Sequence, residues 1–192
     1  MMKMLSLYQI RDMAVGSGRA VYSVQQLSNL ISRPRATSTV YLSRLANKGL
    51  ARKVGKGRIS FTDDDLVIAT QLVEPSYISL GSALLFHGII RQVQKRTECV
   101  TTKNTFDYGD RGIFYHKISE ALFFGYKKHQ KSNSYVFVAE PEKALIDGLY
   151  LNIYSNKEVS EYMPYLNQRR FKRLVGSFSG HWGSNKLREM TK

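Results

Sequence analysis

The pattern that decides the fold lies in residues 22–61, which read YSVQQLSNLISRPRATSTVYLSRLANKGLARKVGKGRISF. Ser23 followed three positions later by Gln26 forms a capping box, so we expect a helix to begin at Ser23. Pro34 disfavours helical geometry in the residue before it and suits the first turn of a new helix. A second helix is therefore expected over residues 34–48, after a tight turn.

A short hairpin is predicted directly after these helices. Gly49 suits the C-terminal end of the second helix. Residues 52–61 contain Gly55-Lys56-Gly57 between two short segments, a pattern typical of two strands around a turn. A further helix is expected over residues 5–14, ahead of the pattern. This order of elements predicts a winged helix-turn-helix, in which the helix at residues 34–48 enters the major groove of DNA.

Basic residues are concentrated in this part of the chain. The 192 residues include 29 Lys and Arg and 15 Asp and Glu, which gives a net charge of +14. Residues 1–62 hold 11 of the basic residues and one acid, Asp12, whereas residues 63–192 hold 18 basic and 14 acidic residues. Such a segment suggests a polyanionic partner. Double-stranded DNA is preferred because a helix cannot enter the narrow major groove of A-form RNA.

The uneven charge also predicts two domains. We expect a winged helix-turn-helix DNA-binding domain at residues 1–65 and a second domain with a basic helical tail at residues 74–192. The join falls near Asp63-Asp64-Asp65 or Glu74-Pro75, since proline ends the preceding element and acids do not suit a nucleic-acid-binding face.

The predicted DNA-binding residues lie on the exposed face of the second helix, at its ends, or on the hairpin. On the helical wheel, Ser38, Tyr41, Leu42 and Leu45 form the packing face. The candidates are Arg33, Arg35, Ala36, Thr37, Val40, Ser43, Arg44, Lys48, Arg52, Lys53, Lys56 and Arg58. Arginines on the helix are expected to contact guanine, and Ala36 and Val40 to contact thymine methyl groups. The hairpin cations should bind phosphate and supply affinity rather than sequence preference.

The second domain is expected to contain a small antiparallel sheet and helices, so the predicted fold class is α+β. Short apolar segments predict strands at residues 98–102, 112–118, 122–127 and 135–139. Helices are expected at residues 79–87, at residues 142–154 and from Asn167 onward. The last of these is amphipathic and basic, with Arg169, Arg170, Lys172 and Arg173 around Phe171 and Leu174, and it leads to Phe178, Trp182 and a final short helix.

Few residues suggest catalysis. The single cysteine, Cys99, excludes an intrachain disulfide, the four histidines lack metal-ligand spacing, and no phosphate-binding loop of the form GxxxxGK[ST] occurs. Residues 140–143, Glu-Pro-Glu-Lys, resemble the acids and lysine of nucleases but suit a helix start better. We therefore expect no enzyme, no cofactor and no metal. The longest apolar stretch, Ile78–Ile90, is short of the roughly 20 residues that a membrane span needs, so a cytoplasmic protein is expected.

The second domain resembles a known family in several segments taken together. Residues 75–79 (PSYIS), 86–88 (FHG), 124–126 (FGY) and 139–145 (AEPEKAL) occur in this order. They are similar to segments of the AbiEi family of antitoxin-type transcriptional regulators, and the likeness covers about residues 5–155. The resemblance implies a winged helix ahead of this domain and a regulator that binds repeats in its own promoter. It also implies that the second domain restrains a co-encoded nucleotidyltransferase-like toxin.

Three functions follow from these features, in order of preference. The first is a sequence-specific DNA-binding repressor of antitoxin type. The second is a one-component regulator whose C-terminal domain senses a small molecule, and the third is a nuclease targeted by the winged helix. Helix-turn-helix shapes also serve as protein-interaction modules, and a basic face can be merely solvated. Arg44 could contact a base, a phosphate or an acid such as Asp64, and the sequence leaves these alternatives open. It also leaves open whether the protein binds DNA as a dimer.

Overall fold

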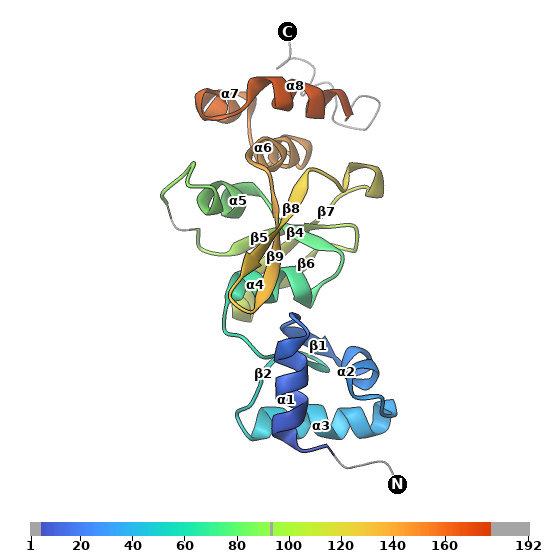
Figure 1. The fold of residues 1–192 in the computed structure, drawn as a ribbon. Helices are drawn as coiled ribbons and strands as arrows, with labels where there is room; N and C mark the ends of the chain where they lie inside the picture. Colours follow the sequence, from blue (N-terminus) through green and yellow to red (C-terminus); the bar gives the residue numbers. More distant parts are fainter. Residues whose placement is uncertain (1–4, 93, 178–192) are drawn as a thin grey trace. The chain divides into compact units, whose positions relative to one another are not determined.

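The computed structural model describes residues 5–92 and 94–177, which form a mixed α+β fold with two sheets (Figure 1). The chain divides into two compact units. The first comprises residues 1–73 together with 129–136, and the second comprises residues 74–128 and 137–192.

The first unit contains four helices and a three-stranded antiparallel sheet among its described residues. Its elements are α1 (Leu7–Gly16), β1 (Val21–Ser23), α2 (Val24–Ile31), α3 (Arg35–Asn47), β2 (Arg52–Gly55), β3 (Arg58–Ser60) and α4 (Asp65–Leu72). The strand order is β1-β3-β2. Buried apolar side chains of α1, α2, α3 and β3 form one core, which includes Ile10, Leu27, Leu45 and Ile59.

Local sequence signals account for the helix boundaries in this unit. The capping box of Ser23 and Gln26 is present, so the predicted start of α2 is confirmed. A second capping box, of Ser6 and Gln9, begins α1. Pro34 is the N-cap residue of α3, which lies within the predicted range of residues 34–48. Gly49 follows the helix with φ +67°, a backbone conformation that glycine adopts without strain.

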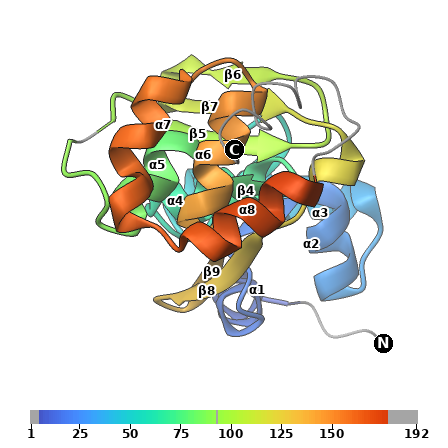
Figure 2. The ribbon, with the colours of Figure 1, turned by 90° about the horizontal axis from the view of Figure 1, so that it is seen from above.

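The second unit is built on a six-stranded sheet of order β6-β7-β5-β4-β9-β8. Its strands are β4 (Ser76–Ile78), β5 (Thr97–Thr101), β6 (Phe106–Tyr108), β7 (Ile113–Lys117), β8 (Tyr126–Lys131) and β9 (Ser134–Ala139), and β8 and β9 continue into residues 129–136 of the first unit. Its helices are α5 (Leu80–Phe86), α6 (Pro141–Tyr150), α7 (Asn156–Tyr162) and α8 (Gln168–Ser177), with short 3₁₀ turns η1 (Gly109–Arg111), η2 (Glu120–Leu122) and η3 (Met163–Tyr165). Figures 1 and 2 show α6 lying between the sheet and the pair α7 and α8.

The prediction of a small antiparallel sheet in the second unit is wrong in two respects. The sheet is mixed, because β4 pairs in parallel with β9 and β5 pairs in parallel with β7. Other elements separate these partners in sequence, including α5 between β4 and β9 and β6 with η1 between β5 and β7. Such connections permit parallel neighbours. The strand predicted at residues 122–127 begins only at Tyr126, after η2, and the three-residue strands β4 and β6 were too short to show a sequence pattern.

One helix prediction in the second unit also needs correction, whereas the helix expected at residues 79–87 is confirmed as α5. The helix expected to reach Tyr154 ends at Tyr150, and α7 begins after a capping box of Ser155 and Glu158. Ser79 is the N-cap residue of α5, but its hydroxyl makes no capping hydrogen bond and instead donates to Asp147 Oδ2 at 2.8 Å. Cys99 is a free cysteine and is buried. The predictions for Phe178, Trp182 and a final helix lie outside the described residues.

A buried ionic network joins α6 to the sheet of the second unit. Lys143 and Asp147, four residues apart on α6, form an ion pair with fully buried side chains. Lys143 Nζ also donates to the Tyr77 hydroxyl at 2.8 Å, and that hydroxyl donates to Asp147 Oδ2 at 3.0 Å. Burial lowers the pKa of Lys143 despite the neighbouring carboxylate, and burial together with Asp147 raises the pKa of Tyr77. Each polar group of the network therefore has a partner, as a buried charge requires.

Candidate nucleic-acid interface

The inner face of α3 fixes which side chains its other face presents. Ser38, Leu42 and Leu45 are buried, and Tyr41 packs against the same core. The Ser38 hydroxyl donates to the Pro34 carbonyl at 3.1 Å, which satisfies a buried polar group inside the first turn. These four residues are the packing face predicted from the helical wheel, so the remaining face of α3 is directed to solvent.

The turn before α3 is held by hydrogen bonds that set the start of this helix. Ser32 has φ +50°, the left-handed conformation in which α2 ends. The Arg33 amide donates to the Ser28 carbonyl at 3.1 Å, and the Ser28 hydroxyl donates back to the Arg33 carbonyl at 2.5 Å. This reciprocal pair orders the backbone that carries Arg33 into the first turn of α3.

The structure places ten of the twelve predicted DNA-binding residues at exposed positions, and Arg33 and Arg58 are half-buried. On α3 and just after it, the exposed candidates are Arg35, Ala36, Thr37, Val40, Ser43, Arg44 and Lys48. Val40 keeps 48% of its surface exposed, although burial of an apolar side chain is favourable. Its position on this face suits contact with a thymine methyl group.

The β2–β3 hairpin carries the remaining candidates. Val54 and Ile59 point into the core, which leaves Arg52, Lys53 and Lys56 exposed. The pairing register shifts between Lys53 and Gly55, so the hairpin contains a bulge before its tip. Gly57 has φ +65°, a conformation that permits the tight turn next to Lys56. The turn thus presents one lysine at a place where the backbone can approach a ligand closely.

One hairpin cation is engaged within the protein. Arg52 Nη1 lies 3.2 Å from Asp63 Oδ1, and both side chains are exposed. Beside them, an open depression of about 670 Å³ is lined by residues including Asn47, Lys53 and Phe61. Binding of phosphate at Arg52 would compete with Asp63, so this residue is a weaker candidate than Lys56. Composition indicated the basic surplus, but the carboxylate that faces Arg52 could be located only in the structure.

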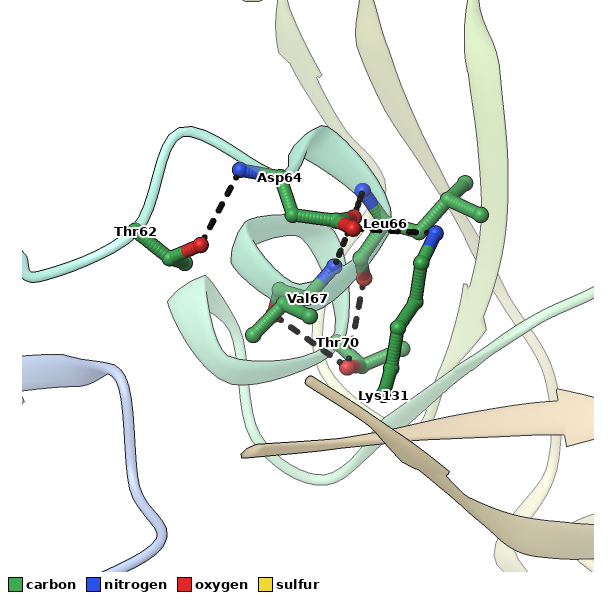
Figure 3. A network of polar contacts seen from close by, with 6 residues as sticks. All are labelled: Thr62, Asp64, Leu66, Val67, Thr70 and Lys131. Atoms are coloured by element: carbon green, nitrogen blue, oxygen red, sulfur yellow. Dashed lines mark hydrogen bonds and ion pairs between the residues drawn. The ribbon is translucent and has the colours of Figure 1, made fainter. Parts of the chain in front are cut away.

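The pairing of Arg44 with Asp64 that the sequence left open does not occur. Asp64 Oδ2 lies 3.0 Å from Lys131 Nζ, and its Oδ1 accepts hydrogen bonds from the Leu66 and Val67 amides at the start of α4 (Figure 3). Within residues 5–92 and 94–177, Arg44 has no ion pair, as is also true of Arg35 and Lys56. These cations are available to an external anion.

A separate group of charges surrounds the nuclease-like segment of the second unit. Glu140 lies 2.6 Å from Lys127 and 3.2 Å from Arg170, whereas Glu142 Oε1 accepts a hydrogen bond from the Asn167 amide at 2.9 Å. Lys143 belongs to the buried network and points to other partners. Glu140 is the N-cap residue of α6, without a side-chain capping bond, and its partner helix α8 is the amphipathic basic helix expected from Asn167 onward.

Glu140 should contribute to stability in a pH-dependent manner. Burial acts to raise the pKa of Glu140, but the interactions with Lys127 and Arg170 outweigh it and hold the pKa below the usual 4.5. A carboxyl whose pKa is lower in the folded state stabilises the fold above its unfolded pKa, and this contribution disappears as the pH falls through the folded pKa. In Glu140→Gln, urea denaturation between about pH 5 and pH 3 should therefore show a shallower loss of stability than in the parent protein. The exposed Glu161→Gln is the control, and an equal slope in the Glu140 variant would contradict the assignment.

Neither a membrane-spanning helix nor a metal-binding cluster is found in the part of the chain that the structure describes. No helix there is long and apolar enough to cross a membrane. Likewise, no group of three or more His, Cys, Asp or Glu side chains at residues 5–92 and 94–177 is arranged so that it could hold a metal ion.

Comparison with known proteins adds no assignment: the chain matches neither a protein-family model nor a curated protein. The geometry and charge of α3 and the β2–β3 hairpin are therefore the features that point to a function.

Proposed function

We propose that this protein is a sequence-specific regulator of transcription that binds double-stranded DNA through its first unit. In this proposal α2 and α3 form the helix-turn-helix, the β2–β3 hairpin is the wing, and the unit is a winged helix-turn-helix. The observation that carries the proposal is the exposed face of α3, which combines Arg35 and Arg44 with the small and apolar side chains Ala36 and Val40. A face of this composition can contact both guanine edges and thymine methyl groups in the major groove.

The charge distribution supports the same function. A surface needs mixed charges for solubility, yet residues 1–62 contain 11 basic residues and one acid. Six of the exposed cations lie on α3, directly after it or on the hairpin, which are the elements that a winged helix-turn-helix presents to DNA. The exposed Arg11 of α1 pairs with Asp12. Base contacts by α3 would then supply the sequence preference, and phosphate contacts by the hairpin would supply affinity for any duplex.

The second unit supports a narrower proposal through its resemblance to AbiEi regulators. We propose that the chain represses its own promoter and restrains a co-encoded nucleotidyltransferase-like toxin through this unit. In the structure the PSYIS and AEPEKAL segments supply Tyr77, Ser79 and Lys143 to the buried network, with Asp147 one turn further along α6. Their side chains hold the sheet to α6, a role that would keep the shape of a protein-binding surface constant.

The two parts of the proposal can be tested separately. Footprinting of the full chain on its own upstream DNA should protect a defined site, and purification of the native protein should recover a nucleotidyltransferase-like partner. Protection without a partner would support the regulator and remove the antitoxin assignment. A partner without protection would indicate that the first unit is a protein-interaction module.

A steep salt dependence is the direct physical test of DNA binding by the basic unit. If about five phosphates are neutralised, the logarithm of the association constant should fall with the logarithm of salt concentration at a slope of about −4 to −5. Fluorescence anisotropy of a labelled operator duplex, titrated at several salt concentrations, measures this slope. A slope near zero would contradict the proposal that the cations of α3 and the hairpin contact phosphate.

A further inference from the structure

The first unit contains a segment that lies far from it in sequence. Residues 129–136, the tip of the β8–β9 hairpin, group with residues 1–73. The tip approaches α4. The N-cap residue Asp64 and Gln71 of this helix are seven positions apart and therefore lie on one helical face. Both of these residues hold the tip, one through an ion pair and the other through hydrogen bonds.

Gln71 links the tip to the edge of the three-stranded sheet. Its side chain is 2% exposed. The amide oxygen Oε1 accepts hydrogen bonds from the Ala20 and Val21 amides at 2.9 and 3.1 Å. The amide nitrogen Nε2 donates to the Ser134 hydroxyl at 3.0 Å and to the Tyr135 carbonyl at 3.2 Å. One buried amide group thus joins β1 on one side to β9 on the other.

Further contacts strengthen this connection. The Ser134 hydroxyl donates to the Gly18 carbonyl at 2.9 Å, just before β1. At the other end of α4, Lys131 pairs with Asp64, the residue that caps the helix (Figure 3). A cavity of about 130 Å³ remains next to the tip, lined in part by Val15, Phe61 and Val67. Polar contacts thus hold the tip to both ends of α4 and to the residues before β1.

The link continues to the wing through the register of the sheet. β1 pairs with β3, so that Val21 faces Ser60 and Ser23 faces Arg58. β3 in turn pairs with β2 and carries one side of the β2–β3 hairpin. Hydrogen bonds therefore run from the tip through Gln71 and β1 to the strand that bears Arg58. In the other direction, β8 and β9 continue into the six-stranded sheet of the second unit.

We propose that residues 129–136 position the wing: when the tip is bound to Gln71 and Asp64, β1 holds the β2–β3 hairpin in the geometry that binds DNA. This inference rests on the proposed DNA-binding function. A change of β8 and β9 in the second unit would then alter the affinity of the first unit for DNA, because the tip is their continuation. Asp64, Gln71, Lys131 and Ser134 are positioning residues and do not touch DNA.

Whether Asp64→Asn raises or lowers the affinity for DNA distinguishes a positioning role from a simple effect of charge. Asp64→Asn keeps an oxygen for capping α4 but removes the charge that pairs with Lys131. Loss of an acid from a DNA-binding unit should raise affinity if charge alone matters. If the tip positions the wing, the affinity of Asp64→Asn for the operator should instead fall by about threefold, the effect of losing a partly exposed ion pair. The affinity of Lys131→Ala for the operator should fall by a similar factor. The double variant should be no weaker than Lys131→Ala alone, because the two residues act through one contact.

A second measurement does not depend on DNA. Amide hydrogen exchange of the full chain should become faster at Ala20 and Val21, and in residues 52–60, in both Asp64→Asn and Ser134→Ala. Asp107→Asn, which removes an equal charge at an exposed position of the second unit, is the matched control for Asp64→Asn and should leave exchange at these residues unchanged. Unchanged exchange in the tip variants, or an affinity increase in Asp64→Asn, would overturn the inference. Failure of the parent protein to bind any duplex would instead overturn the proposed function, while the exchange data still test the link.

Discussion

Replacement of Lys143 by methionine should destabilise the second unit by about 3–5 kcal/mol, the usual cost of leaving a buried charge without its partner. The Lys143 and Asp147 side chains are both fully buried, so the Asp147 carboxylate of this variant cannot reach water. Two hydroxyl donors, from Tyr77 and Ser79, remain to it. They are neutral and replace the lysine charge only in part. Because a whole domain is stable by only about 5–15 kcal/mol, this single change is a large fraction of the total.

Hydrogen exchange along α6 is the appropriate measurement, since a protein with two units need not unfold in one step. Protection of α6 should fall in Lys143→Met and remain at the parental level in Lys157→Met, which removes an exposed lysine from α7 of the same unit. A further variant, Lys143→Met combined with Asp147→Leu, should be more stable than Lys143→Met alone, because it also removes the unpaired carboxylate. Equal protection in Lys143→Met and the parent protein would show that the ion pair contributes nothing.

This network illustrates what the sequence could not reveal. Lys143 and Asp147 are four residues apart, the spacing of an ordinary surface ion pair on a helix, and Lys143 beside two glutamates indicated a helix start. Their burial depends on Tyr77 and Ser79, which come from a strand and a helix cap almost 70 positions earlier. Local periodicity carries no information on such a partner, so the sequence pattern could suggest a motif but not its chemistry.

Signals of short range were more informative. The capping box at Ser23 predicted the start of α2, and the wheel centred on Leu42 identified the buried and exposed faces of α3. Both features depend on residues within one or two helical turns. The attachment of residues 129–136 to the first unit could not be anticipated in this way, because the contacts of Gln71 span 63 and 64 positions. The strand order of the six-stranded sheet is likewise a property of distant pairs.

Replacement of Arg35 by alanine should cost about 1–3 kcal/mol in binding to the preferred operator and relax the preference at particular bases. Arg35 begins α3, where recognition helices present side chains to base edges. Lys56 lies at the turn of the hairpin, beside a glycine with positive φ, and is expected to contact phosphate. Lys56→Ala should therefore weaken binding to all duplexes alike and reduce the salt slope by about one.

Binding of both variants to the operator and to a scrambled duplex, across a salt series, distinguishes the two roles. The ratio of the two affinities should fall for Arg35→Ala and stay constant for Lys56→Ala, since phosphate contacts carry no direct sequence information. Arg52→Ala is a control on the same hairpin. Because Arg52 already pairs with Asp63, its replacement should reduce the salt slope less than the replacement of Lys56 does. If Arg35→Ala lost equal affinity on both duplexes while Lys56→Ala changed the preferred base, the assignment would be reversed. The hairpin would then be the element that recognises sequence, and α3 would serve to hold the backbone.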